Sequence, residues 1–165
     1  MSTLYVVATP IGNLEDITLR AIRVLREVGL IASEDTRVTR KLLSRYGIDT
    51  PQTSYHEHNR RAKLSKILSV LSEKDVALAS DAGTPGINDP GAELVAAAAQ
   101  EGHSVVPIPG ASAVTSAIAV SGLNITGFLY LGYLPRKRTE RKDLLESVKW
   151  NQRVLVALES PHRLN

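Results

Sequence analysis

The stretch Val76-Ala77-Leu78-Ala79-Ser80-Asp81-Ala82-Gly83-Thr84-Pro85-Gly86-Ile87-Asn88-Asp89-Pro90-Gly91 decides the fold. Its apolar start predicts a buried strand, and the residues after it predict a helix with Asp89 as N-cap and Pro90 in the first turn. The glycines between them let a ligand approach the main chain closely, and the prolines stiffen the loop. Open α/β sheets bind ligands at such loops, although a stiff connector is the alternative interpretation.

Composition limits the class of protein. The chain has 165 residues, of which 43% are hydrophobic and 22% charged, as in a globular protein of one domain or slightly more. No apolar run approaches the roughly 20 residues of a membrane span, and the N-terminus lacks a basic signal-peptide region. The chain has no cysteine, which excludes disulfides and thiolate chemistry. We expect a cytoplasmic protein.

The basic residues are clustered, although the formal net charge is only +3. The clusters comprise Arg37, Arg40, Lys41 and Arg45; Arg60, Arg61, Lys63 and Lys66; and Arg136, Lys137, Arg138, Arg141 and Lys142. Each cluster alone is explained by a solvated helix face. Three together favour a polyanionic partner.

Apolar runs alternate with segments of helical periodicity along most of the chain. Strands are predicted at 4–8, 30–33, 53–56, 76–80, 104–108, 128–133 and 153–158, and helices at 18–28, 38–46, 61–71, 92–100, 113–120 and 139–149. This alternation predicts an α/β fold with a parallel sheet and right-handed crossovers. We expect residues 1–122 to form a cofactor-binding domain. Residues 123–165 are expected to begin a second α/β domain that is incomplete here.

Three turns should meet at one edge of the sheet, because each follows the carboxyl end of a strand. They are Thr9–Asn13, Asp81–Pro90 and Pro109–Ala113. Their small residues and exposed backbone suit a ligand held by main-chain hydrogen bonds. The sequence has neither a G-x-x-x-x-G-K-[ST] phosphate loop nor a G-x-G-x-x-G motif after its first strand. A cofactor without phosphates is therefore favoured.

Five motifs in order carry a resemblance to a known family. They are Thr9-Pro10-Ile11-Gly12-Asn13-Leu14-Glu15-Asp16-Ile17-Thr18, Ser33-Glu34-Asp35-Thr36-Arg37, Ser80–Gly91, Pro109-Gly110-Ala111-Ser112-Ala113 and Glu159-Ser160-Pro161-His162-Arg163. The chain resembles, over nearly its whole length, the ribosomal RNA small subunit methyltransferase I family of the tetrapyrrole-methylase superfamily.

The resemblance implies a homodimeric enzyme of two α/β domains. It implies transfer of a methyl group from S-adenosyl-L-methionine to the ribose 2′-OH of a cytidine in 16S rRNA. The cofactor contacts implied for this chain are Pro10, Ile11, Asp81, Gly83, Thr84, Pro85, Ile87, Ser112 and Ala113. Thr84 stands where many relatives carry the Asp of a Gly-Asp-Pro loop, so this chain lacks that carboxylate. Because the family's second domain continues past residue 165, we expect these residues alone to have little activity.

A ribose hydroxyl is a weak acid, so a general base would assist its attack. The carboxylates expected near strand ends are Asp35, Asp81, Asp89 and Glu159. Helix capping is the alternative for Asp35 and the neighbouring Glu34, and for Asp89. Arg37 is a candidate for a target phosphate or for a local ion pair with Asp35. We expect Arg37, Arg40, Lys41, Arg136, Lys137 and Arg138 to contact RNA.

Two other functions remain open at this stage. A small-molecule methylase of the same fold would not require the basic clusters, and a non-catalytic RNA-binding module would not bind the cofactor. His56-Glu57-His58 suggests a metal only weakly, because no third ligand is evident. We therefore expect no metal.

Overall fold

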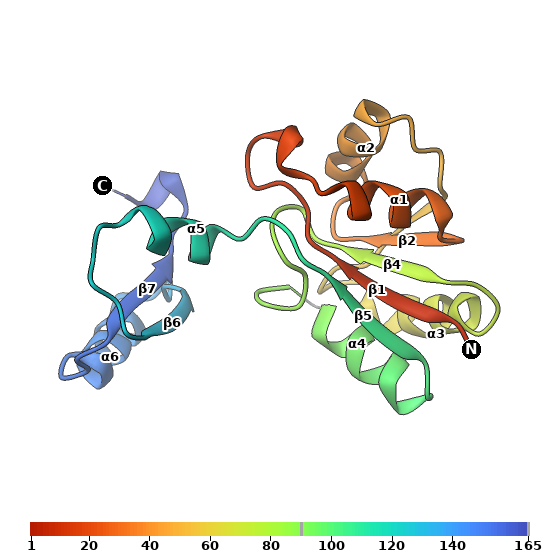
Figure 1. Cartoon of the computed structure of the whole chain (residues 1–165). Coiled ribbons are helices and arrows are strands. Elements are labelled where there is room, and N and C mark those ends of the chain that lie inside the picture. Colours follow the sequence, from red (N-terminus) through yellow and green to blue (C-terminus); the bar gives the residue numbers. More distant parts are fainter. Residues whose placement is uncertain (90, 165) are drawn as a thin grey trace. The chain divides into compact units, whose positions relative to one another are not determined.

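The computed structural model describes residues 1–89 and 91–164, and these form two compact units, Met1–Ser116 and Ala117–Asn165. Figure 1 shows the chain, with the elements of the first unit in red to green and those of the second in teal to blue. The predicted α/β class is confirmed, with every predicted helix and strand present within a few residues. The boundary predicted after Gly122 stays a prediction.

The first unit contains a five-stranded parallel sheet in the order β3-β2-β4-β1-β5. Its strands are β1 (Thr3–Val7), β2 (Leu30–Ser33), β3 (Gln52–Ser54), β4 (Val76–Ala79) and β5 (Ser104–Ile108). The helices are α1 (Leu19–Glu27), α2 (Thr36–Arg45), α3 (Arg60–Leu71) and α4 (Gly91–Gln100), with a short 3₁₀ helix, η1 (Leu14–Asp16). Helix α5 (Ala113–Val120) begins in this unit.

Helices cover both faces of this sheet, α1 and α2 on one side and α3 and α4 on the other (Figure 1). Strand β4 shows why its sequence is a continuous apolar run. Ala77 and Ala79 pack in the cluster beneath α1 and α2, while Val76 and Leu78 pack in the cluster beneath α3 and α4. Since successive side chains of a strand point to opposite faces, a strand covered on both faces needs apolar residues throughout.

Residues predicted to begin and end helices do so. The Thr18 hydroxyl accepts a hydrogen bond from Ala21 N at 3.1 Å, and the Asp35 carboxylate accepts one from Arg37 N at 2.8 Å. Helix α2 ends before Gly47, whose φ of +59° favours glycine. Helix α2 begins at Thr36, two residues earlier than predicted, because Asp35 caps it.

Strand β5 lies at an edge of the sheet and contains Pro107. Ala8 N donates to the Ile108 oxygen at 3.2 Å, so the Ile108 backbone groups face β1 and those of Pro107 face away from it. The missing N–H of Pro107 therefore costs no hydrogen bond in the sheet.

The second unit has the same local pattern on a smaller scale. Strands β6 (Phe128–Tyr133) and β7 (Val154–Leu158) pair in parallel, connected by α6 (Arg138–Val148), and a 3₁₀ helix, η2 (Pro161–Arg163), follows. No side chain among the described residues of this unit is buried. Of the described residues, no helix is long and apolar enough to cross a membrane.

Candidate functional site

The three turns predicted to converge do so within the first unit. Thr9 and Gly83 form an antiparallel bridge, with Thr9 N donating to Gly83 O at 2.9 Å and Gly83 N donating to Thr9 O at 3.0 Å. A Cβ on Gly83 would lie 3.6 Å from the Ile11 side chain and 3.7 Å from the Ala111 oxygen. The turns after β1, β4 and β5 therefore meet at Gly83, and we call this meeting point the junction. The φ of Gly83 is +83°, a backbone angle that favours glycine.

The buried hydroxyls of Thr9 and Ser80 stabilise this junction through hydrogen bonds to backbone oxygens. Thr9 Oγ1 donates to Ser80 O at 3.0 Å, and Ser80 Oγ donates to Gly83 O at 3.1 Å. Both side chains are buried. Buried hydroxyls with hydrogen-bond partners hold a loop more rigidly than apolar contact does, so the junction has a defined shape.

Crossed hydrogen bonds tie the loop after β2 to the loop after β4. Asp35 N donates to Asp81 Oδ1 at 2.9 Å, and Asp81 N donates to Glu34 Oε2 at 3.3 Å. The Glu34 and Asp81 carboxylates thus lie at neighbouring strand ends. Burial raises the pKa of both side chains, and the charge of Asp35 adds to the rise in each. A carboxylate with a raised pKa binds a proton more readily.

Asp35 is engaged differently. Its carboxylate caps α2 and forms an ion pair with Arg37, with Arg37 Nη2 2.6 Å from Asp35 Oδ2. The Arg37 side chain, followed by the Arg37 backbone N–H, lowers the pKa of Asp35 to about 2. Both alternatives from the sequence, the cap and the local ion pair, are confirmed. Asp35 is consequently a weak base.

Asp89 holds the far end of the loop after β4. Its carboxylate accepts hydrogen bonds from Gly86 N at 2.9 Å and from Gly91 N at 2.8 Å. This agrees with the predicted capping of α4, while the predicted role of Pro90 lies outside the described residues. A Cβ on Gly91 would lie 2.7 Å from Asp89 Oδ1 and 2.9 Å from Leu78 Cδ2, so glycine is required there.

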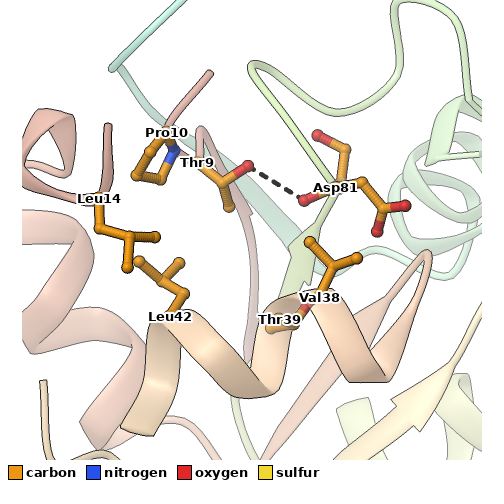
Figure 2. A pocket seen from close by; sticks show the side chains of 8 residues that line it. Thr9, Pro10, Leu14, Val38, Thr39, Leu42 and Asp81 are labelled. Atoms are coloured by element: carbon orange, nitrogen blue, oxygen red, sulfur yellow. Dashed lines mark hydrogen bonds between the residues drawn. The ribbon is translucent and has the colours of Figure 1, made fainter. Parts of the chain in front are cut away.

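A pocket lies beside the junction, between α2 and the ends of β1 and β4 (Figure 2). We call it the α2 pocket, and it is lined by Thr9, Pro10, Leu14, Val38, Thr39, Leu42, Ser80 and Asp81. Figure 2 shows Pro10, Leu14 and Leu42 on one side, with Val38 and Asp81 on the other. Its empty volume is about 280 Å³, including its open mouth. The pocket shares Pro10 and Asp81 with the residues expected to bind the cofactor.

The remaining residues expected to bind the cofactor lie along the same turns. Pro85 is buried, Thr84 is half-buried and Ile87 is 52% exposed, while Ser112 and Ala113 follow Ala111 at the start of α5. All belong to the first unit. Glu159 belongs to the second unit, where its carboxylate accepts from Ser160 N at 2.8 Å and pairs with Arg163 at 3.1 Å.

The basic residues expected to contact RNA are exposed. Arg37, Arg40 and Lys41 lie on α2, and Arg136, Lys137 and Arg138 lie before and at the start of α6. Arg37 is paired with Asp35, and Lys137 with Glu140 at 3.0 Å. The α2 residues face solvent beside the α2 pocket, because Thr39 and Leu42 of the same helix line it.

Sequence reasoning missed two residues of this site. Glu34 was considered only as a cap, but it accepts a hydrogen bond from Asp81 N. Thr39 was not considered, although a hydroxyl residue on the apolar face of a helix is an available signal. His56 bonds locally with Asn59, and among residues 1–89 and 91–164 no three metal-ligating side chains are grouped.

Comparison with known proteins identifies the class that this fold and site define. Residues 3–165 match the family model of tetrapyrrole (corrin/porphyrin) methylases. Proteins named ribosomal RNA small subunit methyltransferase I from Halalkalibacterium halodurans and Thermotoga maritima are 52% and 51% identical over 98% and 99% of this chain. The chain therefore belongs to the tetrapyrrole methylase family and, within it, to the ribosomal RNA small subunit methyltransferase I group.

The chain spans 56% of the Halalkalibacterium protein and 74% of the Thermotoga protein. Solved structures of diphthine synthase and of Thermus thermophilus uroporphyrin III C-methyltransferase share its fold, with TM-scores of 0.73 and 0.66. Both alignments cover 98% of this chain. They cover 66% of diphthine synthase at 15% sequence identity and 72% of the methyltransferase at 21% sequence identity.

Proposed function

We propose that this chain is the cofactor-binding part of a methyltransferase that transfers a methyl group from S-adenosyl-L-methionine to the ribose 2′-OH of a cytidine in 16S rRNA. The observation that carries the proposal is the junction at Gly83, where three turns meet in a group whose relatives carry the name of an rRNA methyltransferase. We further propose a cytoplasmic homodimer that acts without metal.

The residues of the junction fit a sulfonium cofactor. Small residues at Gly83 and Ala111 let the three turns approach one another closely, and the nearby carboxylates of Glu34 and Asp81 give the region a negative field. A sulfonium is a cation and needs no phosphate cradle, in agreement with the absent phosphate loop. We propose that Pro10, Ile11, Gly83, Thr84, Pro85, Ile87, Ser112 and Ala113 hold the cofactor. When bound, the cofactor supplies an electrophilic methyl group.

Positioning contributes much of the rate in such a displacement, since the nucleophile, the methyl carbon and the leaving sulfur must be in line. The rigid Thr9–Gly83 bridge supports this alignment by fixing the turns relative to one another. A base that takes the hydroxyl proton contributes typically 10²–10⁴-fold.

Among the carboxylates considered, Asp81 is the best candidate for this base. Asp35 is paired with Arg37, Asp89 accepts from two backbone amides, and Glu159 is paired with Arg163. Only the Oδ1 atom of Asp81 accepts a hydrogen bond from the described residues, and burial raises its pKa. We propose that its Oδ2 atom accepts the ribose proton.

The proposed partner is small-subunit rRNA. The exposed residues Arg37, Arg40 and Lys41 on α2 and Arg136, Lys137 and Arg138 near α6 supply charges for its phosphates. The names of the relatives favour this substrate over a tetrapyrrole. Phosphate contacts should make RNA affinity fall steeply with added salt.

The test is methyl transfer from labelled S-adenosyl-L-methionine to unmethylated small ribosomal subunits by the full-length protein that contains this chain. Asp81→Asn should lower kcat about 100-fold or more, since it removes a general base. Asp49→Asn is the matched control, because Asp49 is exposed and outside the site. Wild-type protein that transfers no methyl to the rRNA would refute the function. An active Asp81→Asn variant would refute only the role of Asp81.

A further inference from the structure

The α2 pocket has a size that restricts its occupant. Its empty volume of about 280 Å³ includes open solvent at the mouth, so the enclosed space is smaller than that of ordinary small-molecule sites, about 300–1,000 Å³. A single ring fits such a space better than a complete nucleoside-containing cofactor does. The walls formed by Pro10, Leu14, Val38 and Leu42 are apolar, as a planar ring requires.

Thr39 contributes an unsatisfied hydroxyl to the wall of this pocket. The residue is 3% exposed, and its Oγ1 has no hydrogen-bond partner among the described residues. The other hydroxyls of the lining, those of Thr9 and Ser80, both donate to backbone oxygens. A buried hydroxyl without a partner destabilises the folded state, so Thr39 has a stabilising interaction to gain from a ligand.

The hydroxyl of Thr39 can reach the pocket without a change in the backbone. Threonine in a helix populates two χ1 rotamers, so a rotation of about 120° moves its hydroxyl to another staggered position on Cβ. Because Thr39 lines the pocket, a rotamer change is enough to present the hydroxyl to an occupant. Asp81 lines the same pocket and has a carboxylate oxygen, Oδ2, with no partner among the residues described.

The outer face of the same helix identifies the source of the ring. Arg40, Lys41 and Arg45 are exposed on α2, as is Arg37, whose charge is paired with Asp35. Their positive charge beside the pocket favours a polyanionic chain that passes along α2 while one of its rings enters. RNA-binding proteins recognise unstacked bases in this way, through apolar contacts and hydrogen bonds to the base edge.

We propose that the α2 pocket receives the base of the target nucleotide, with Thr39 Oγ1 donating a hydrogen bond to the O2 carbonyl of the pyrimidine and Asp81 lying beside its ribose. This inference rests on the proposed function. The O2 atom is next to the glycosidic bond, so a base held at O2 keeps its ribose at the mouth of the pocket. The same insertion thus brings the 2′-OH to the carboxylate proposed as its base.

Enzymes that modify nucleotides commonly rotate the target out of its stack, and the pocket stabilises that rotated state. Thr39 is here a binding residue for substrate, with no part in holding the cofactor. Its loss should therefore affect RNA and leave the binding of the cofactor product unchanged.

The experiment compares wild type with Thr39→Val, Thr39→Ser and Thr50→Val in the full-length protein. Steady-state methyl transfer to unmethylated small ribosomal subunits gives kcat/KM, calorimetry gives the affinity for S-adenosylhomocysteine, and thermal unfolding gives stability. Thr50 is the matched control, since its hydroxyl donates to Leu25 O at 2.6 Å away from the pocket.

Thr39→Val should lower kcat/KM for the subunits about tenfold, the loss of one hydrogen bond, without lowering the unfolding midpoint. Thr39→Ser should restore kcat/KM, because it keeps the hydroxyl. Thr50→Val should lower the unfolding midpoint and leave kcat/KM unchanged.

Two outcomes overturn the base pocket. One is a kcat/KM for Thr39→Val equal to wild type, and the other is a loss of S-adenosylhomocysteine affinity in that variant, which would assign the pocket to the cofactor. In both, wild-type protein still methylates the subunits, so the proposed function survives. Wild-type protein without activity on rRNA would instead refute the function itself.

Discussion

The two compact units have the same local architecture but different interiors. Each contains parallel strands joined by a helix, yet the first has helices on both faces of its sheet. Strand β4 is buried throughout and β1 contains the buried residues Leu4 and Val7, whereas none of the described residues of β6 and β7 is buried. A strand–helix–strand pattern therefore determines topology, while burial depends on whether a second layer of helices is present.

The largest expected difference between the units is in hydrogen exchange of the isolated 165-residue chain. Amides of β1 and β4 should exchange only on global unfolding, which costs about 5 kcal/mol or more in a stable domain. Amides of β6 and β7 should exchange through local opening at much lower cost, because a two-stranded sheet is marginally stable. Mass-spectrometric exchange at neutral pH measures both. Equal protection of β4 and β7 would contradict the comparison.

The second largest expected difference between the units is in the loss of stability caused by leucine-to-alanine substitutions. Leu25 of α1 is 0% exposed, whereas Leu155 of β7 is 38% exposed. Leu25→Ala should destabilise the chain by about 2–5 kcal/mol, the usual cost of a core truncation. Leu155→Ala should cost less than about 1 kcal/mol because much of its side chain already contacts water. Urea unfolding followed by circular dichroism at 222 nm compares them. A Leu155→Ala cost as large as that of Leu25→Ala would show a core in the second unit.

Alanine substitutions at Gly83 and Gly122, two glycines with similar backbone angles, test whether the junction binds the cofactor. Gly83 has φ +83° and Gly122 has φ +70°, so alanine is strained at both by about 1–2 kcal/mol. An added Cβ at Gly83 would contact Ile11 and Ala111, but at Gly122 it would meet nothing within 4 Å. Because the strain of Gly83→Ala falls on the junction of the three turns, this variant should weaken S-adenosylhomocysteine binding, while the same strain in Gly122→Ala should lower stability alone. Calorimetry on the full-length variants would detect this, and equal affinities would argue against a cofactor at the junction.

The smallest expected effect is the pH dependence that burial creates at Asp81. Burial raises the pKa of this carboxyl above the 3.8 of an ordinary aspartate. The folded state then holds more protons than the unfolded state, so this group's contribution to stability falls as pH rises from about 3.8 through the raised value. Asp81→Asn should consequently gain stability relative to wild type across that interval. Unfolding midpoints between pH 4 and 7 would measure it, and a constant difference would contradict the shifted pKa.

Sequence patterns predicted the sheet well because β4 is apolar throughout and Thr18 and Asp35 are helix caps with known chemistry. Convergence of the turns after β1, β4 and β5 was also predictable, since carboxyl ends of parallel strands share an edge. The strand order and the hydrogen bond from Asp81 N to the Glu34 carboxylate could not be predicted. Both depend on contacts between residues far apart in sequence. That the Thr39 hydroxyl has no hydrogen-bond partner among the described residues could not be predicted from sequence either, for the same reason.

Pro107 affects how the protein associates with other molecules. Its nitrogen faces outward from the edge strand β5 and carries no hydrogen. An incoming extended segment would find a donor missing in the middle of the edge, so the sheet resists growth by strand addition there. Assembly through this edge would have to use side chains, and the folded chain is protected on this side against the edge-to-edge stacking that begins many aggregates.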